Sequence, residues 1–171
     1  MSSTVIDFNQ YTFIDKDEEM SRVLHSRTVF RLSFFLAGFL TTSDFSVPPG
    51  SIYPDLDVVF PRSHRRLRPD LVWLAHPLTD EEGLEAYHGV PDVVFEVVSA
   101  SSYQEDSVVK KRFYASESVP EYWLIFPETK TIHVYHLQGT EYVLSASATE
   151  RGTVASSVIE GWQVSVEGMF V

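Results

Sequence analysis

A single carboxylate interrupts the most apolar strand-like run of the chain. Glu96 lies within residues 93–98, and the remaining five residues of this run are all Val or Phe. A continuous apolar run of this length is typical of a strand that is buried on both faces of a sheet. A buried carboxylate without partners is strongly destabilising. Glu96 therefore lies at an exposed edge, or it is held for a purpose by a metal ion, a cation or hydrogen bonds.

Two further charged residues complete a candidate site with Glu96. Asp70 opens a second apolar stretch, residues 70–75, and Lys110 lies in a predicted helix. If the two strands pair, the Asp70 and Glu96 carboxylates meet, and their hard oxygens suit Mg²⁺. Asp92 is four residues from Glu96 on the same strand, roughly 13 Å away, and cannot share an ion with it. Such a metal site with a lysine beside it predicts metal-assisted phosphodiester hydrolysis, in which Lys110 orients or activates a water or stabilises charge on the phosphate.

Length and composition indicate one folded domain spanning residues 1–171. The 171 residues are enough to bury a core, and 44% of them are hydrophobic. The chain has no cysteine, which excludes disulfides and thiolate metal sites. No run of about 18 apolar residues occurs, and the first residues lack the features of a signal peptide. We therefore expect a cytoplasmic protein that does not enter a membrane.

The charge balance argues against general attraction to nucleic acid. The formal net charge is −11, with 24 acidic and 13 basic residues, whereas nonspecific DNA binding depends on Lys and Arg. One segment departs from this balance, because four arginines gather just before Asp70: Arg62, Arg65, Arg66 and Arg68. This cluster is either a solvated loop or a set of DNA-phosphate contacts beside the candidate site.

The order of apolar patterns predicts a mixed α/β (α+β) fold, with a central mixed sheet flanked by helices. Helices are expected at 16–40 and 103–117, and strands at 56–60, 71–75, 93–98, 122–126, 131–137 and 142–144, with a further strand within 161–166. In the first helix Val23, Phe30, Phe34 and Ala37 follow helical spacing, and in the second helix Val109, Phe113 and Ser116 do so. Residues 1–15 form an irregular or strand-like lead, and residues 80–83 form a polar loop.

Four motifs in order resemble the Uma-two family of proposed restriction endonucleases over residues 55–137. They are Arg68–Leu74, Gly89–Ser99, the set Asp106, Lys110 and Tyr114, and Val119–Ile125. The resemblance implies a restriction-endonuclease-like core of the PD-(D/E)XK nuclease superfamily that acts on DNA. It also implies Asp70 and Glu96 as ligands of Mg²⁺, with Mn²⁺ as a substitute. The usual lysine position, two after the second acid, is Val98 here, and the family's lysine matches Lys110 on the following helix.

Some features depart from the family pattern. Ala100 stands where a proline is usual after the serine, and His25-Ser26 stands where the family often has His-Gln. An acid from the first helix, Glu18 or Glu19, is a candidate third ligand, whereas His25 is interpreted as structural. Lys111 would point about 100° away from Lys110, so we expect only one of these lysines to face the site.

Three hypotheses remain open at this level. The first is a Mg²⁺-dependent endodeoxyribonuclease, with a homodimer supplying two sites for two strands. The second is a catalytically inactive nuclease fold that serves as a binding or assembly module. The third is a nonenzymatic structural protein in which an arginine such as Arg112 pairs with Glu96.

Overall fold

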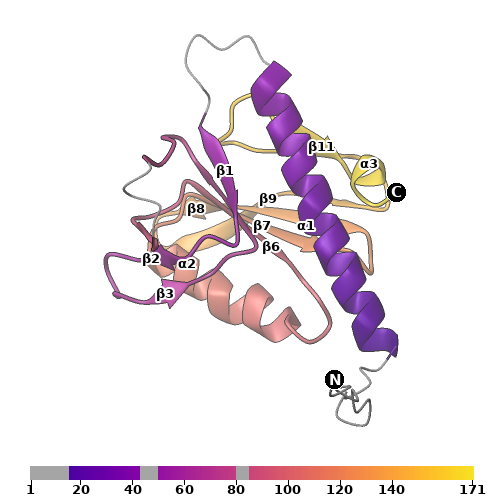
Figure 1. Ribbon diagram of the computed structural model, residues 1–171, viewed down its shortest axis with the longest axis horizontal. Helices are drawn as coiled ribbons and strands as arrows, with labels where there is room; N and C mark the ends of the chain where they lie inside the picture. Colours follow the sequence, from indigo (N-terminus) through magenta and orange to yellow (C-terminus); the bar gives the residue numbers. More distant parts are fainter. Residues whose placement is uncertain (1–15, 43–49, 80–84) are drawn as a thin grey trace, which may run out of the picture.

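The computed structural model describes residues 16–42, 50–79 and 85–171. A six-stranded mixed sheet forms the centre of the described part (Figure 1). Its strands, in spatial order, are β1 (Ser51–Pro54), β4 (Leu71–Leu74), β6 (Val93–Val97), β7 (Glu121–Phe126), β8 (Thr131–Gln138) and β9 (Glu141–Thr149). The helical elements are α1 (Lys16–Thr42), the π-helix η2 (Glu105–Lys110), α2 (Lys111–Ser116) and α3 (Val166–Met169).

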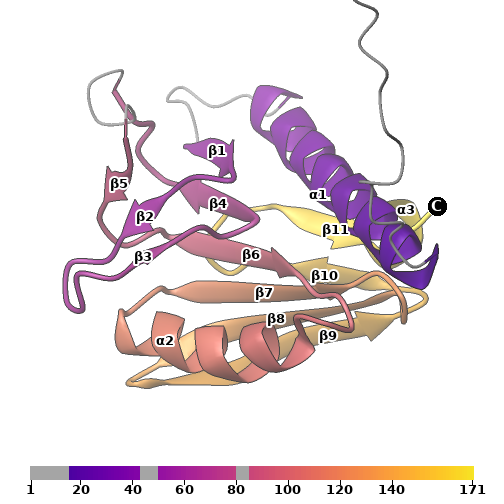
Figure 2. The same cartoon turned by 60° about the horizontal axis from the view of Figure 1, so that its bottom comes forward.

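The connection between β6 and β7 decides which elements face the candidate site. These two strands are parallel, while every other neighbouring pair in the sheet is antiparallel. A parallel pair needs a long crossover, and here the crossover consists of η2 and α2. Figure 2 shows η2 and α2 on one face of the sheet and α1 on the other. Side chains that alternate along β6 therefore point towards different helices.

Two hydrophobic cores follow from this alternation. Phe95 packs on the α1 side with Trp123 and Trp162, its ring centroid 5.5 and 5.8 Å from theirs. Val94 belongs to the second core, together with Tyr114 of α2. The remaining strands make two small sheets: β3 (Arg66–Leu67), β2 (Val58–Val59) and β5 (Tyr87–His88) in one, and β10 (Thr153–Ala155) and β11 (Gln163–Ser165) in the other.

Most of the predicted elements are confirmed, with changes at their ends. The central position of the strand at 93–98 is confirmed by β6, and the strand expected at 161–166 by β11. The strand expected at 56–60 is reduced to Val58–Val59, because turns flank it, and the strand expected at 142–144 extends to Glu141–Thr149. The expected lead (1–15) and polar loop (80–83) lie outside the described residues.

Helix α1 buries a different face from the one that its apolar spacing marks. Val23, Phe30 and Phe34 do share a face, but they are 56%, 70% and 67% exposed. Leu32 and Leu36 are the fully buried residues, in contact with the core against the sheet. A helix with apolar residues on two faces can bury either, and the choice depends on the surface that it meets.

The helix expected at 103–117 also differs in the face that it buries. Phe113 is buried, but Val109 is 43% exposed and Ser116 is exposed. Val109 lies in the π-helix η2, whose i→i+5 hydrogen bonds rotate side chains away from the positions of an α-helix, whereas Phe113 and Ser116 lie in α2. Here the buried residue of η2 is Asp106.

By length and composition alone, residues Glu19–Thr41 of α1 would be long and apolar enough to cross a membrane. Core helices of soluble proteins meet the same criterion. The segment includes Arg22, Arg27 and Arg31, which are costly inside a bilayer, and its Leu32 and Leu36 pack on the sheet. The expectation of a protein outside the membrane stays a prediction.

Candidate active site

Glu96 is 1% exposed and is held by two side chains from the η2–α2 crossover. The Tyr114 hydroxyl donates a hydrogen bond of 2.8 Å to Glu96 Oε1. Lys110 Nζ lies 3.0 Å from Glu96 Oε2. Glu96 points to the face of the sheet that η2 and α2 cover, because residues two apart in a strand share a face and Val94 packs in the core on that face. The carboxylate is therefore buried with partners, as its place in an apolar strand requires.

The π-helix explains how Lys110 reaches Glu96. Lys110 Nζ also lies 2.8 Å from Asp106 Oδ1, and Asp106 is 2% exposed. Both residues belong to η2, and π-turns occur frequently at functional sites. Lys111 points elsewhere, with its ammonium 3.5 Å from the centroid of the Tyr135 ring. Only Lys110 of the two lysines faces the site, as the helical rotation predicts.

Asp70 joins Glu96 through the pairing of β4 with β6. The antiparallel register sets Leu71 opposite Phe95, so the residue before Leu71, Asp70, comes beside the residue after Phe95, Glu96. Asp70 Oδ2 accepts a hydrogen bond of 2.7 Å from the Val97 N–H. The two acids therefore lie together at the end of β6, on adjoining strands.

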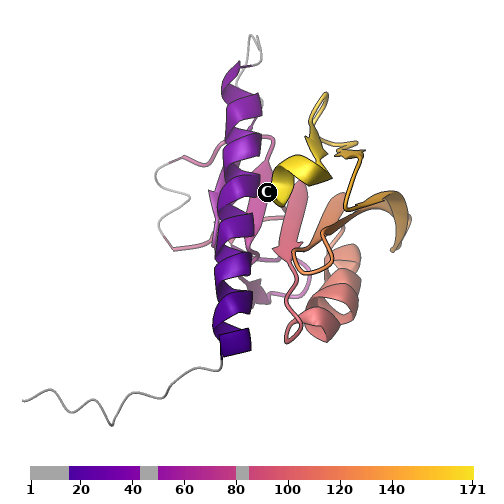
Figure 3. The ribbon, with the colours of Figure 1, turned by 90° about the vertical axis from the view of Figure 1, so that its right-hand side faces the viewer.

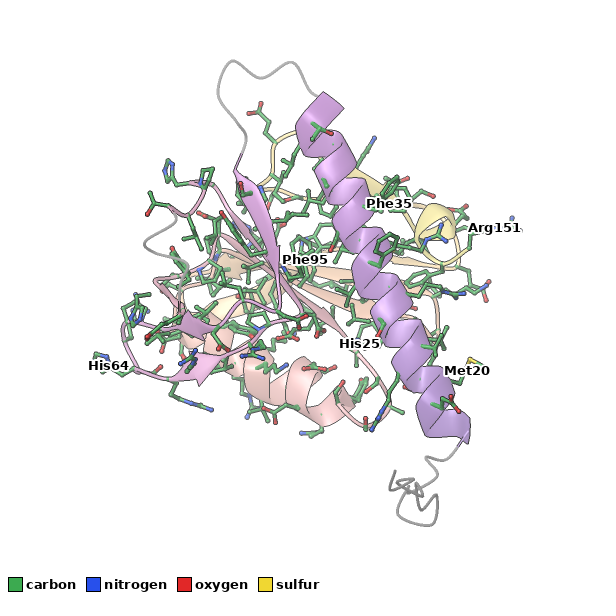
Figure 4. All side chains as sticks on the ribbon, in the orientation of Figure 1. Met20, His25, Phe35, His64, Phe95 and Arg151 are labelled. Atoms are coloured by element: carbon green, nitrogen blue, oxygen red, sulfur yellow. The ribbon has the colours of Figure 1, made fainter. Side chains whose placement is uncertain are left out.

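His25 of α1 reaches the same carboxylate from the opposite face of the sheet. Its Nε2 lies 3.1 Å from Asp70 Oδ2, with 34% of the His25 side chain and 20% of the Asp70 side chain exposed. Figure 4 shows His25 on the side of α1 that faces the sheet. Glu19 is exposed in the first turns of α1, and the Glu18 side chain lies outside the described part. Among the side chains of α1 that the structure describes, His25 is the one seen at Asp70, and the prediction of Glu18 as a third ligand falls outside them.

A cleft opens beside His25. Its volume is about 700 Å³, and it lies between the first half of α1 and the turn after β6. It is lined by Ser21, Arg22, His25, Ser26, Ser99, Ala100, Ser101 and Glu128. His25 connects the cleft to the acidic site, since it lines the cleft and also contacts Asp70, whereas Asp70, Glu96 and Lys110 are not part of the lining.

The crowding of charge shifts the pKa values of the site. Burial raises the pKa of Glu96 to about 8, and the neighbouring charges of Asp70 and Asp106 raise it too, while Lys110 and Tyr114 act against them. Burial alone would lower the Lys110 pKa, but Glu96 and Asp106 together raise it above its usual value. The hydrogen bond to Asp70 raises the pKa of His25, against the effect of burial. At neutral pH the protonated Lys110 ammonium therefore lies beside Glu96, an acid whose ionisation is disfavoured.

The arginine cluster is engaged within the chain. Arg66 and Arg68 pair with Asp57 at 2.6 and 2.8 Å, and the hydrogen bonds from Arg68 and Arg66 hold the pKa of the Asp57 carboxyl well below its usual range. Arg62 donates to the Ser116 carbonyl, 2.7 Å away. The Arg65 guanidinium lies 4.8 Å from the centroid of the Phe113 ring. The Arg66 and Arg68 side chains remain 53% and 61% exposed, so a DNA-contacting role stays a prediction.

The alternative pairing of Glu96 with Arg112 is wrong in this structure. The partners of Glu96 are Lys110 and Tyr114, while Arg112 is exposed. Asp92 contacts the backbone of the segment after β4: its Oδ2 accepts a hydrogen bond of 2.8 Å from the Ala75 N–H. The prediction that Asp92 does not share a site with Glu96 agrees with this contact.

Comparison with protein families places the chain. The model of the Uma2 family, described as "putative restriction endonuclease", matches residues 17–167. The chain belongs to the Uma2 family. Among solved structures, a putative nuclease belonging to DUF820 from Anabaena variabilis has a TM-score of 0.65 and 17% sequence identity, and the match covers 86% of this chain and 80% of that one. At this identity the match shows the fold. No protein with a curated description matches the chain.

The donor set of this Uma2 protein fits a magnesium ion. Mg²⁺ is usually bound by one or two carboxylates, with waters and substrate phosphates completing its shell. Asp70 and Glu96 supply two carboxylates from adjoining strands. Among the described residues, no group of three or more His, Asp or Glu side chains is placed to hold a metal ion. Magnesium binding by Asp70 and Glu96 stays a prediction.

Three residues that contact the site in this Uma2 protein had no role assigned to them from the sequence: Asp106 and Tyr114 were only part of a family motif, and His25 was interpreted as structural. The first two had a signal, because residues 106, 110 and 114 are four apart and share one side of a helix. His25 had no local signal. It contacts a residue 45 positions away, a relation that only the packing of α1 on the sheet creates.

Proposed function

We propose that this Uma2 protein is a Mg²⁺-dependent endonuclease that hydrolyses phosphodiester bonds in DNA. The single observation that carries the proposal is the meeting of Asp70 and Glu96 from adjoining strands, with Lys110 3.0 Å from Glu96. Family membership supports the same reading. A buried carboxylate with a strongly raised pKa, such as Glu96, marks a candidate catalytic site.

Asp70 and Glu96 would hold the ion, with Mn²⁺ as a substitute. The bound ion would polarise the scissile phosphate and make a water more acidic. The two ligands are oriented by their neighbours. Tyr114 holds one oxygen of Glu96, while the Val97 N–H and His25 hold one oxygen of Asp70. Such outer contacts fix the direction in which a ligand presents its lone pairs.

The role proposed for Lys110 is electrostatic. Its raised pKa keeps the ammonium charged at neutral pH, which argues against Lys110 as a general base. A fixed positive charge instead stabilises the negative charge that builds on a phosphate during hydrolysis. Asp106, 2.8 Å from the ammonium, keeps that charge at the site.

Further expectations belong to the same proposal. DNA would enter through the cleft beside His25, with Arg62, Arg65, Arg66 and Arg68 as candidate phosphate contacts. The net charge of −11 predicts weak nonspecific affinity that falls steeply with added salt. We also propose a cytoplasmic location and a homodimer, whose two sites would serve two strands.

The test is cleavage of supercoiled and linear DNA with Mg²⁺ or Mn²⁺. Asp70→Asn, Glu96→Gln and Lys110→Ala are each expected to lower the rate at least 100-fold, because each removes a ligand or the stabilising charge. Lys111→Ala is the matched control, since it removes the same charge one residue away and should keep the rate within about twofold. Circular dichroism establishes that each variant is folded.

A second function is favoured by one observation. In this structure Lys110 already pairs with Glu96 and Asp106, at 3.0 and 2.8 Å, as expected of an inactive nuclease fold that serves as a binding or assembly module. Calorimetric titration with Mg²⁺ and Mn²⁺ separates the two. A Kd well above millimolar for both ions, together with intact DNA in every cleavage assay, would exclude the nuclease and favour the module.

A further inference from the structure

An apolar stripe runs along the outer side of α1. It consists of Met20, Val23, Phe30 and Phe34, which are 60%, 56%, 70% and 67% exposed. Figure 3 shows α1 in front of the rest of the molecule along nearly its whole length, with α3 to one side of it. Figure 4 shows Met20 directed away from the sheet, opposite to His25. Clustered exposed apolar residues of this size mark interaction surfaces.

The spacing of the stripe is that of a coiled-coil seam. With Arg27 and Ala37 included, its positions are 20, 23, 27, 30, 34 and 37, alternating steps of three and four residues. This repeat keeps side chains on one narrow line that faces a second helix. The line from Met20 to Phe34 is about 21 Å long, at 1.5 Å per residue. A helix is therefore a better geometric match for this surface than a strand or a loop.

We propose that two copies of this chain dimerise by packing their α1 stripes antiparallel around a two-fold axis. With the axis between positions 28 and 29, every seam residue meets a partner of complementary size or charge. The pairs are Met20 with the partner's Ala37, Val23 with the partner's Phe34, and Arg27 with the partner's Phe30. Interlocking of large with small side chains is what a well-packed helix interface needs.

The charge of Arg27 selects the antiparallel direction. A parallel pair would set each Arg27 against the partner's Arg27, and like charges in a seam repel each other. The antiparallel pair sets the guanidinium against the partner's Phe30 ring, a favourable cation–π arrangement. Arg31 does not compete for this place, because its guanidinium donates to the Gly168 and Val171 carbonyls at 2.7 and 2.6 Å.

The small residues at the end of the seam leave room for the partner. A Cβ added to Gly38 would meet nothing within 4 Å. A glycine within a helix is destabilising in itself, so its place here suggests a need for close approach. Beside Ala37, Gly38 leaves a shallow notch where the partner's Met20 would lie.

The area of the stripe suffices for a dimer at the weak end of specific interfaces. Its exposed aromatic and aliphatic surface is on the order of 500 Å² per chain, so pairing would bury roughly 1,000 Å² in total, near the lower limit of specific interfaces. The dimer should therefore dissociate on dilution. Because the stripe lies opposite His25, pairing would leave the active-site cleft open. The inference does not depend on the proposed catalysis.

Sedimentation velocity over a range of protein concentrations is the first test. The wild type should shift from monomer to dimer as concentration rises. Phe34→Glu should weaken association at least tenfold, because it places an acid in the seam. Leu144→Glu is the matched control, since Leu144 is also exposed (49%) but lies on β9, and it should dimerise as the wild type does. A monomeric wild type, or an undiminished Phe34→Glu dimer, overturns the proposal.

Disulfide crosslinking tests whether the two α1 helices pack antiparallel. The chain has no native cysteine, so each crosslink arises from an introduced cysteine. Val23→Cys and Phe34→Cys are prepared as separate variants and oxidised alone and as a mixture. The antiparallel seam predicts a crosslink between the two variants in the mixture, and little crosslinking of either alone. Crosslinking of each variant with itself indicates a parallel pair and overturns the proposed register.

Vesicles of phosphatidylcholine and phosphatidylglycerol test the remaining alternative, a membrane surface. A monomer that cosediments with the vesicles, and no longer does so as Phe34→Glu, would assign the stripe to a membrane surface and overturn the dimer.

Discussion

At the scale of single residues, Glu96 shows how an apolar strand accommodates an acid. Glu96 follows Phe95 and precedes Val97 in the strand, and its carboxylate is buried on the opposite face from theirs, where Tyr114 and Lys110 contact its two oxygens. Removal of either partner would leave a buried polar group unpaired, which costs more than the contact itself contributes. The same contacts keep the carboxylate in one orientation, so stability and the proposed catalysis depend on the same atoms.

The raised pKa of Glu96 predicts how stability depends on pH in the metal-free protein. The value rises from 4.5 to about 8 on folding, so between these values the native state binds more protons than the unfolded state. The contribution of Glu96 to the free energy of unfolding is therefore fully present below about pH 4.5. It is lost as pH rises towards 8, by an amount on the order of a few kcal/mol. The pKa of His25 is also raised on folding. Its contribution to the free energy of unfolding is therefore also lost as pH rises, above the usual pKa of a histidine.

Urea unfolding at pH 5 and pH 8 with a chelator measures this dependence. The free energy of unfolding of the wild type should fall more between the two pH values than that of Glu96→Gln, which cannot titrate at this position. Equal slopes in the two proteins would show that Glu96 ionises normally in the folded state.

At the scale of elements, the π-helix η2 joins a structural irregularity to the proposed chemistry. Asp106 and Lys110 are both on η2, and both side chains turn towards Glu96. The crossover that contains η2 exists because β6 and β7 are parallel. The lysine thus comes from the crossover rather than from the strand, where Val98 occupies the usual lysine position.

Asp106 is predicted to position Lys110. Asp106→Asn removes the charge that holds the ammonium, so we expect DNA cleavage to fall about 10- to 100-fold with little change in KM. Glu105→Gln, an exposed neighbour on the same element, is the control and should cleave at the wild-type rate. If Asp106→Asn also kept the wild-type rate, the ion pair would have no role in catalysis.

At the scale of the whole molecule, the candidate site lies where both layers of helices meet the end of the sheet. β4 and β6 bring Asp70 and Glu96, η2 brings Lys110, and α1 brings His25 from the other face. Binding of a metal at this junction would connect elements that are otherwise held by separate cores, and should therefore stabilise the whole fold.

Thermal unfolding with and without Mg²⁺ at pH 8 measures this connection. A ligand at 100 times its Kd stabilises the native state by about 2.7 kcal/mol, and for a domain of this size each kcal/mol raises Tm by roughly 2–4 °C. The wild type should show such a rise, whereas Asp70→Asn should show little. A rise of equal size in Asp70→Asn would place the ion elsewhere on the surface.

The order of most elements, and the meeting of Asp70 with Glu96 on adjoining strands, could be predicted from the sequence. The apolar run around Glu96 marked the central strand, and the run after Asp70 marked its neighbour, because strand patterns depend on local alternation and burial. The motifs that resemble the family pointed to Lys110 in the same way. All three residues come together in the structure, while their roles in metal binding and catalysis stay predictions.

Only the tertiary structure decided which surfaces meet. Two faces of α1 are apolar, and packing on the sheet buried Leu32 and Leu36 while leaving Phe30 and Phe34 exposed. That choice also turned His25 towards Asp70. The physical reason is that a helical period reveals a face but not its partner. The partner depends on the shape and hydrophobicity of elements far away in the chain, which exist as a surface only after the sheet has formed.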